Sequence, residues 1–224
     1  LNLVATMEKS THDVWAGRHP VTGQWIVVQG NGCNLVIYDI TDIKNPVELD
    51  EWDNNDDSEY EDACADHWRR QIDHTVGGRA YMVVVGAKID GPPLPFTILD
   101  FTDPTNIFEV SRWIIPGEPT SPEPNFYTFG GTEYETWNGY VAAGIMHAGV
   151  WVFDIGSPER ALEPVTMGFY QHPMIPQAEG GTTNKPAPFA PMIWTAAFDD
   201  RGYVLSPDTG TGLYILKFQG TLTG

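Results

Sequence analysis

The chain has 224 residues, of which 42% are hydrophobic and 12% aromatic, so it can bury a core and is not an intrinsically disordered protein. Its formal net charge of −18 argues against nucleic acid and anionic membrane surfaces as partners, because both require a basic face. No apolar run is long enough to span a bilayer. An acidic surface of this kind fits life in high salt, the binding of many cations or simple solubility, and these alternatives stay open.

The first expected element is a strand over residues 1–7, and no signal peptide is recognised at this end, which indicates a mature or trimmed chain. Further strands are expected at 12–15, 25–29, 35–39 and 47–52, where β-branched and aromatic residues gather. The remaining expected strands repeat this succession and lie at 74–76, from Tyr81, from Phe96, and at 108–113, 140–143, 150–154, 203–205 and 213–216.

The chain repeats itself. The segment 38–48 returns as 99–109 at an offset of 61 residues, a third copy follows with Asp154 placed 54 residues after Asp100, and a fourth puts Lys217 at the Asp position after another 63. Self-similarity at this period is typical of a repeat architecture. Features present in every copy are therefore expected to be structural, and function is sought where the copies differ.

Four antiparallel strands in each repeat are typical of a β-propeller blade. We predict an all-β fold, a single β-propeller domain over 1–224 with four recognisable four-stranded blades at approximately 10–52, 72–113, 125–170 and 193–218. Residues 1–8 are expected to add an outer strand to the last blade, which would remove an open sheet edge. The chain is then either a closed four-bladed ring or part of a larger seven- or eight-bladed propeller, completed by a second chain or a missing N-terminal part.

The segments 35–42, 149–155 and 212–216 resemble the repeats of LVIVD-repeat β-propeller proteins, and the stretch from 194 to 216 is similar to their last blade. The resemblance covers nearly the whole chain and implies an exported or surface propeller without a defined activity. Because the motif is short and apolar, it indicates the fold far better than the function.

A fainter similarity connects residues 12–20 with the selenium-binding protein and methanethiol oxidase propellers, through an aromatic, Arg and His segment. That family implies a His-bound metal, copper. The chain departs from its pattern, because it has neither the full His-rich cluster nor the matching reactive cysteine.

His12 and His74 are expected to open the first strands of their blades, which line the central channel of a propeller. With Glu133 from the third blade and His67 near the same rim, they could hold a transition metal such as copper or zinc at the axis. The alternative is that both histidines hydrogen-bond backbone groups in a water-filled channel.

The densest charge in the chain lies between residues 53 and 62, where Asp53, Asp56, Asp57, Glu59 and Glu61 offer oxygen ligands of the kind that calcium requires. The run lacks the EF-hand order, so a solvated acidic loop is the alternative. The only cysteines, Cys33 and Cys64, form either one disulfide or two buried thiols. A disulfide would close a loop of about 30 residues and stabilise the fold by roughly 3–4 kcal/mol.

His19 and His147 are expected in surface turns, and the Pro- and Gly-rich stretch 173–191 is predicted to be a lid, a docking loop or a passive covering. Phosphate-binding and nucleophile-elbow motifs are absent from the sequence. The sequence therefore favours an extracellular or cell-surface binding or scaffolding module, with a protein or small-molecule ligand on a propeller face and calcium as a candidate cofactor. The alternative is a metal-dependent oxidoreductase of selenium-binding-protein type, with a His-bound metal at the propeller axis.

Overall fold

The structure is a computed structural model that describes residues 1–9, 11, 13–31, 34–53, 67–71, 75–86, 95–116, 134–145, 148–171, 193, 195–208 and 211–219. These residues form four antiparallel sheets, each built from strands that are consecutive in the chain. One short helix, α1 (Pro158–Leu162), follows the third sheet's third strand, and the Ser157 side chain caps it by accepting a hydrogen bond from the Arg160 amide. The predicted all-β, blade-like fold is confirmed.

Each of the first three sheets has four strands in meander order, and the fourth has three. Sheet 1 contains β1 (Asp13–Arg18), β2 (Trp25–Asn31), β3 (Asn34–Asp39) and β4 (Val47–Asp53). Sheet 2 contains β5 (His67–Gln71), β6 (Tyr81–Gly86), β7 (Phe96–Asp100) and β8 (Phe108–Trp113). Sheet 3 contains β9 (Tyr134–Trp137), β10 (Tyr140–Ile145), β11 (Gly149–Asp154) and β12 (Val165–Tyr170). Sheet 4 contains β13 (Ala197–Phe198), β14 (Tyr203–Asp208) and β15 (Gly212–Lys217).

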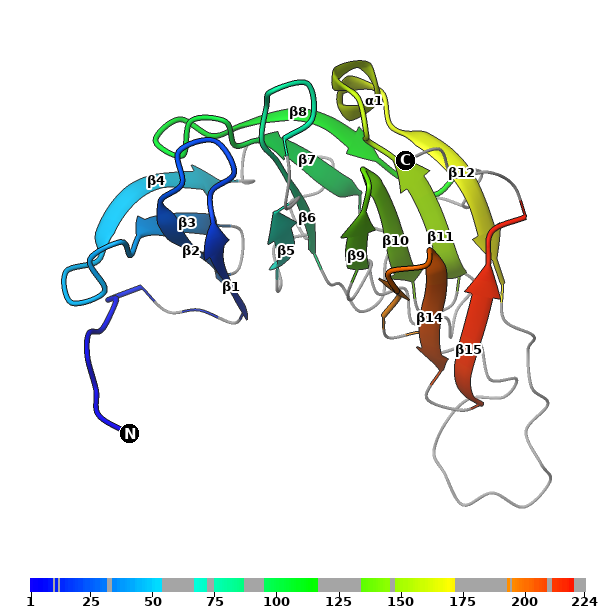
Figure 1. The fold of residues 1–224 in the computed structure, drawn as a ribbon, viewed down its shortest axis with the longest axis horizontal. Coiled ribbons are helices and arrows are strands. Elements are labelled where there is room, and N and C mark those ends of the chain that lie inside the picture. Colours follow the sequence, from blue (N-terminus) through cyan, green and yellow to red (C-terminus); the bar gives the residue numbers. More distant parts are fainter. Residues whose placement is uncertain are drawn as a thin grey trace.

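The four sheets follow one another along an open arc (Figure 1). The first strands β1, β5, β9 and β13 lie on its concave side, and neighbouring ones contact each other, whereas β4, β8 and β12 lie on the convex side. Sheets 1 and 4 stand at opposite ends of the arc. This is the blade arrangement of a propeller, with the innermost strands turned toward the axis.

The repeated Asp residues shape the same turn in three sheets. The side chains of Asp39, Asp100 and Asp154 each accept a hydrogen bond from the amide two residues later, at 2.7, 2.9 and 2.8 Å. Such a bond lets an Asp side chain stabilise a turn directly after a strand. A β-bulge also recurs two residues before each Asp, in the pairing of the third strand with the fourth. The sequence repeat therefore records turn and strand geometry.

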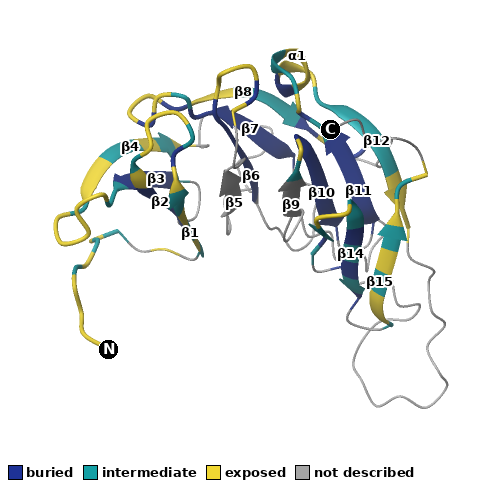
Figure 2. Cartoon of the chain, viewed as in Figure 1, coloured by how far each residue is buried: buried dark blue, intermediate teal, exposed yellow. Residues whose placement is uncertain are grey.

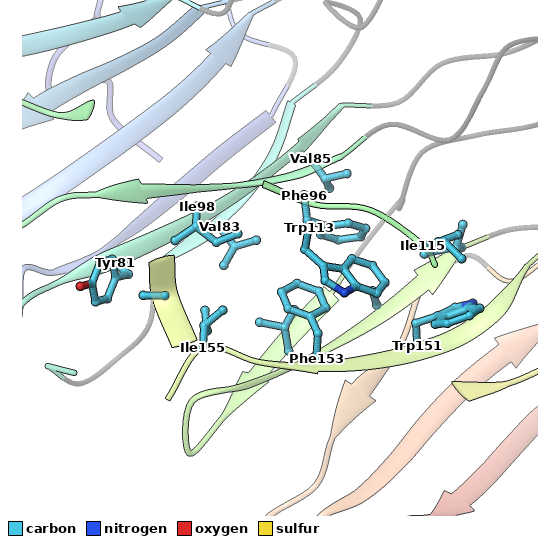
Figure 3. Packing of buried hydrophobic residues seen from close by; sticks show 14 of the residues in the cluster. Tyr81, Val83, Val85, Phe96, Ile98, Trp113, Ile115, Trp151, Phe153 and Ile155 are labelled. Carbon is cyan, nitrogen blue, oxygen red and sulfur yellow. The ribbon is translucent and has the colours of Figure 1, made fainter. Parts of the chain in front are cut away.

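Three apolar cores hold consecutive sheets together, one between each pair. We call the face that a sheet turns toward the next sheet in the chain its forward face, and the opposite face its backward face. Each core joins the forward face of one sheet to the backward face of the following sheet. Between sheets 2 and 3, Phe153 stacks on Trp113 at 4.4 Å and meets Phe96 edge-on at 5.5 Å (Figure 3). Aromatic rings supply much of this burial because each covers a large apolar area. Figure 2 shows the central strands of sheets 2 and 3 almost wholly buried.

Two expected strands differ in the structure. The first strand of sheet 2 is β5, so its expected position at 74–76 is wrong. Val76 instead pairs with Arg79 across a tight turn in which Gly77 and Gly78 have positive φ, a conformation that glycine adopts without steric cost.

Residues 1–8, expected as an outer strand beside β15, carry no strand and lie beside sheet 1. The Lys9 ammonium next to them bonds Glu51 and Glu48 of β4 at 2.7 and 3.0 Å, and these hydrogen bonds raise the pKa of Lys9. Met7 contacts the side chain of Gln29 through its sulfur. These contacts place the segment at the end of the arc opposite β15.

Candidate functional site

The strand order places the candidate axial residues on the innermost strands or next to them in the sequence. His67 begins β5, whereas His12 and Glu133 are the residues that immediately precede β1 and β9. His12, His74 and Glu133 lie outside the described residues, as does the His67 side chain. Contacts between β1 and β5 and between β5 and β9 bring these three strands together on the concave side.

The strand register shows which histidine corresponds to position 12. Ile26 pairs with Asp39 in sheet 1 and Tyr81 pairs with Asp100 in sheet 2, so these two pairs are equivalent. Counting along β2 and β6 from there makes Gly86, the partner of His67, equivalent to Asn31, and Asp13 pairs with Gly30. Position 12 therefore corresponds to His67 and not to His74, which comes after β5 has ended.

The other candidate ligands fall mostly outside the described part of the chain. Asp53 ends β4 and pairs with Asn34, but Asp56, Asp57, Glu59 and Glu61 of the acidic loop are not described, and neither are Cys33 and Cys64. Among the residues that are described, no group of three or more His, Cys, Asp or Glu side chains is placed to hold a metal ion. In the same part of the chain, no helix is long and apolar enough to cross a membrane.

His19 is a buried residue that the sequence did not reveal. It is only 1% exposed, its Nε2 lies 2.6 Å from the carbonyl oxygen of Phe101, and its Nδ1 accepts the amide of Thr22 at 3.0 Å. The expected surface location of His19 is therefore wrong. The ring fixes the turn after β1 to sheet 2, and burial lowers its pKa because the charged form loses solvation.

The four sheets differ in how far the apolar side chains of their forward faces are exposed. The most exposed of these faces is that of sheet 4, which we call the end face. Register places Lys217 at the level of the repeated Asp, so Ile215 corresponds to Ile98 and Leu213 to Phe96. Ile98 and Phe96 are 0% and 1% exposed, whereas Ile215 and Leu213 are 65% and 63% exposed. Strand pairing adds three residues of β14 to the same face, namely Tyr203, Leu205 and Pro207.

Cations border the end face. The guanidinium of Arg201 lies 5.1 Å and the ammonium of Lys217 lies 5.9 Å from the ring centre of Tyr203, within the range of cation–π attraction. Arg201 also forms an ion pair with Asp199. The end face is thus an apolar strip with Lys217 on it, at the level where the other three sheets carry Asp. In Figure 2, β15 is coloured largely as exposed or intermediate.

The opposite end of the arc is covered in part by the chain itself. The backward face of sheet 1 carries Val27, Gln29 and Val36, all buried, and its rim exposes Trp25 beneath the guanidinium of Arg18 at 5.4 Å. Glu48 and Glu51 line the same face from β4, because their strand partners Tyr38 and Val36 point to that side. This face is therefore apolar at its centre and acidic along its outer strand.

Comparisons with known proteins do not reveal a family. No family model and no curated protein matches the chain. Among solved structures, the computationally designed Ika4 protein aligns with a TM-score of 0.49 at 12% identity, over 98% of this chain and 99% of that chain. The C-terminal domain of PilY1 from Pseudomonas aeruginosa aligns with a TM-score of 0.48 at 16% identity, over 92% of this chain and 49% of that chain. With scores below 0.5, neither likeness bears on the function of this chain.

Proposed function

We propose that this protein is an exported or cell-surface binding or scaffolding module that associates with another protein through the end face. The observation that carries the proposal is the exposure of Leu213 and Ile215, at 63% and 65%, on a regular sheet face. Contiguous apolar residues at the surface of a soluble protein mark interaction sites. The net charge of −18 keeps such a protein soluble while the apolar strip remains available to a partner.

The packing within the chain indicates what the end face binds. In sheets 1 and 2, the residues equivalent to Leu213 and Ile215 are buried against the next sheet. In sheet 1 they are Leu35 and Ile37, which lie in the core between sheets 1 and 2. Removing each such side chain from water contributes roughly 1.5–3 kcal/mol. A partner that covers both residues therefore gains the apolar burial that the internal interfaces already use.

Site-specific photo-crosslinking tests this function. A benzophenone amino acid replaces Ile215 in one variant and Leu162 of α1, which is 62% exposed, in a matched control. After irradiation of the exported fraction of the producing cells, position 215 is expected to yield a covalent adduct heavier than the 24.8 kDa chain, and position 162 is not. No adduct at 215, or equal adducts at both positions, would contradict the proposal.

A second candidate function, metal-dependent oxidation at the propeller axis, is favoured by one observation. The innermost strands β1, β5 and β9 lie together on the concave side, and His67 begins the middle one. His12 and Glu133 immediately precede the other two in the sequence. Imidazole and carboxylate groups are the ligands that copper, zinc and non-haem iron use.

Metal analysis of the purified protein decides between the two functions. Stoichiometric copper, zinc or iron that is lost on His12→Ala and on His67→Ala, but kept on His74→Ala, would support the axial site. Calcium alone, with a lower melting temperature in chelator, would support the scaffold and the acidic loop as its site. Protein free of transition metal after expression in metal-supplemented medium would contradict the oxidoreductase.

A further inference from the structure

We infer that the backward face of sheet 1 is a second binding surface, which takes an extended protein segment with an apolar anchor and a cation two residues later. In the structure the chain's own residues 5–9 lie on this surface, and a partner segment of the same pattern displaces them. The surface is at the end of the arc opposite the end face, so the inference is independent of the proposed function.

The segment 5–9 lies on this face in an extended form, beside sheet 1 (Figure 1). Ala5, Met7 and Lys9 are half-buried. The residues between them, Thr6 and Glu8, are exposed. Such alternation is typical of an extended segment that turns one side to a surface. Among the described residues, no backbone hydrogen bond joins the segment to a strand, so side chains hold it in place.

Charge complementarity indicates the chemistry of the occupant. The ammonium of Lys9 donates hydrogen bonds to Glu51 and Glu48 of β4 at 2.7 and 3.0 Å. The three side chains are 36%, 35% and 43% exposed, so water screens these ion pairs and they hold the segment only weakly. The outer strand of this face therefore selects a cation, and a cation from another protein can replace Lys9.

The buried side chain of Gln29 is poorly matched by the present occupant. It is 4% exposed, and its Nε2 donates to the sulfur of Met7, a weak acceptor, at 3.8 Å. Its Oε1 is buried and accepts no hydrogen bond within the described part of the chain. A buried acceptor without a donor is unfavourable. A partner segment with a donor at the place of Met7 would satisfy the amide and bind better than the chain's own segment.

The face also extends beyond the contacts of residues 5–9. Val14 of β1 pairs with Gln29, so its side chain points to the same side of the sheet, and it is 55% exposed. Trp25 lies two residues before Val27 on β2, hence on the same face, and is 45% exposed. These side chains offer a longer partner segment apolar area that stays exposed in the chain alone.

The covalent connection of residues 5–9 to sheet 1 sets the competition. A short tether keeps them near the face at an effective concentration on the order of millimolar, which a free segment must exceed. Lys9→Glu replaces attraction to β4 by repulsion and changes no buried residue. This variant should therefore free the face for a segment supplied from outside.

Isothermal titration calorimetry of the full chain with two synthetic peptides tests the inference. The first peptide has the sequence of residues 1–11. The second differs from it by Met7→Gln and Glu8→Lys, which add a hydrogen-bond donor and a cation. The second peptide is expected to bind the Lys9→Glu chain at least about tenfold more tightly than it binds the parent chain, and more tightly than the first peptide binds that variant.

Matched variants locate the bound peptide. Glu48→Gln with Glu51→Gln, added to the Lys9→Glu chain, should weaken peptide binding at least about tenfold, because the cation then meets no carboxylate on β4. Lys44→Glu makes the same change of charge at an exposed residue in the turn between β3 and β4, and should bind the peptide as the parent chain does. Lys9→Ala, which only truncates an exposed side chain, should shift the affinity in the same direction as Lys9→Glu.

The inference is overturned if neither peptide binds the Lys9→Glu chain or the Lys9→Ala chain. Equal affinity for the parent chain and for both variants would overturn it as well, since residues 5–9 then do not cover the site. Affinity that survives removal of both carboxylates, at Glu48 and Glu51, would show that the peptide lies elsewhere. These outcomes leave the end face untouched, because its crosslink at position 215 is measured separately.

Discussion

We predict that the buried His19 ring stabilises the folded chain and that this contribution depends on pH. His19→Ala removes the group that meets the Phe101 carbonyl at 2.6 Å, and Phe101 is itself fully buried. An unpaired buried carbonyl costs about 1–3 kcal/mol, and the space left by a ring that is 1% exposed adds a cavity term. We expect a loss of about 3 kcal/mol in the free energy of unfolding, which lowers the melting temperature by roughly 6–12 °C in a domain of this size.

The same ring fixes the sign of the pH effect. The ring is buried, which disfavours its charged form, so the pKa of His19 falls below its ordinary value of 6.5. The unfolded chain then binds the proton more readily than the folded one. The contribution of His19 is therefore complete above pH 6.5 and is lost as the pH falls through 6.5 toward the lower pKa of the folded state.

Urea unfolding followed by circular dichroism measures both effects. His19→Gln keeps a neutral donor at every pH, so the stability gap between the parent chain and this variant should shrink as the pH falls from 7.5 to 5.5, in the range set by the pKa of histidine. Val21→Ala, in the same turn and exposed, serves as the control and should change stability by about 0.5 kcal/mol or less. Unfolding of His19→Ala at the urea midpoint of Val21→Ala, or a gap that widens on acidification, would contradict a stabilising role for the buried ring.

Three further substitutions test the cores and turns by the same urea midpoints. Phe153→Ala, at a fully buried ring, should cost about 3–5 kcal/mol, and Phe108→Ala, at a ring 43% exposed, about 1 kcal/mol or less; equal costs would contradict the core in Figure 3. Gly144→Ala would set a Cβ 2.5 Å from the backbone of Thr195 and should cost about 1–3 kcal/mol, so a neutral effect would contradict this close approach of β10 to the residues just before β13. Asp100→Ala should cost about 1–3 kcal/mol, and a stability equal to the parent's would show that its turn forms without the side-chain bond.

The fold was predictable because the repeat encodes local geometry. Asp39, Asp100 and Asp154 stabilise equivalent turns with their own side chains. The apolar runs before them have the length of buried strands and are too short for helices. Short-range chemistry of this kind is visible in a sequence. The first strand of sheet 2 was misplaced, although Gly77-Gly78 next to Val76 signals the tight turn that the structure contains.

The burial of His19 and the exposure of the end face depend on contacts between distant parts of the chain, which no local sequence pattern reveals. His19 is buried by Phe101, which lies 82 residues away in the sequence, so its turn-like surroundings suggested exposure. The alternation of β15 resembles that of β3 and β7, yet Leu213 and Ile215 are exposed whereas Phe96 and Ile98 are buried against the next sheet. The candidate axial histidines are visible in the sequence, but which of them are equivalent is not. Their spacing suggested His12 and His74, and only strand register identifies His67 as the equivalent of position 12.

The most direct test of the end face as a binding surface is hydrogen–deuterium exchange of the peptide covering β15, measured for the purified chain alone and after mixing with the exported fraction of the producing cells. A bound partner covers Leu213 and Ile215, so amide protection in 212–217 should be higher in the mixture than in the purified chain. Protection in 158–162 of α1 should stay constant. Exchange in 212–217 that is the same in both samples would contradict binding through the end face.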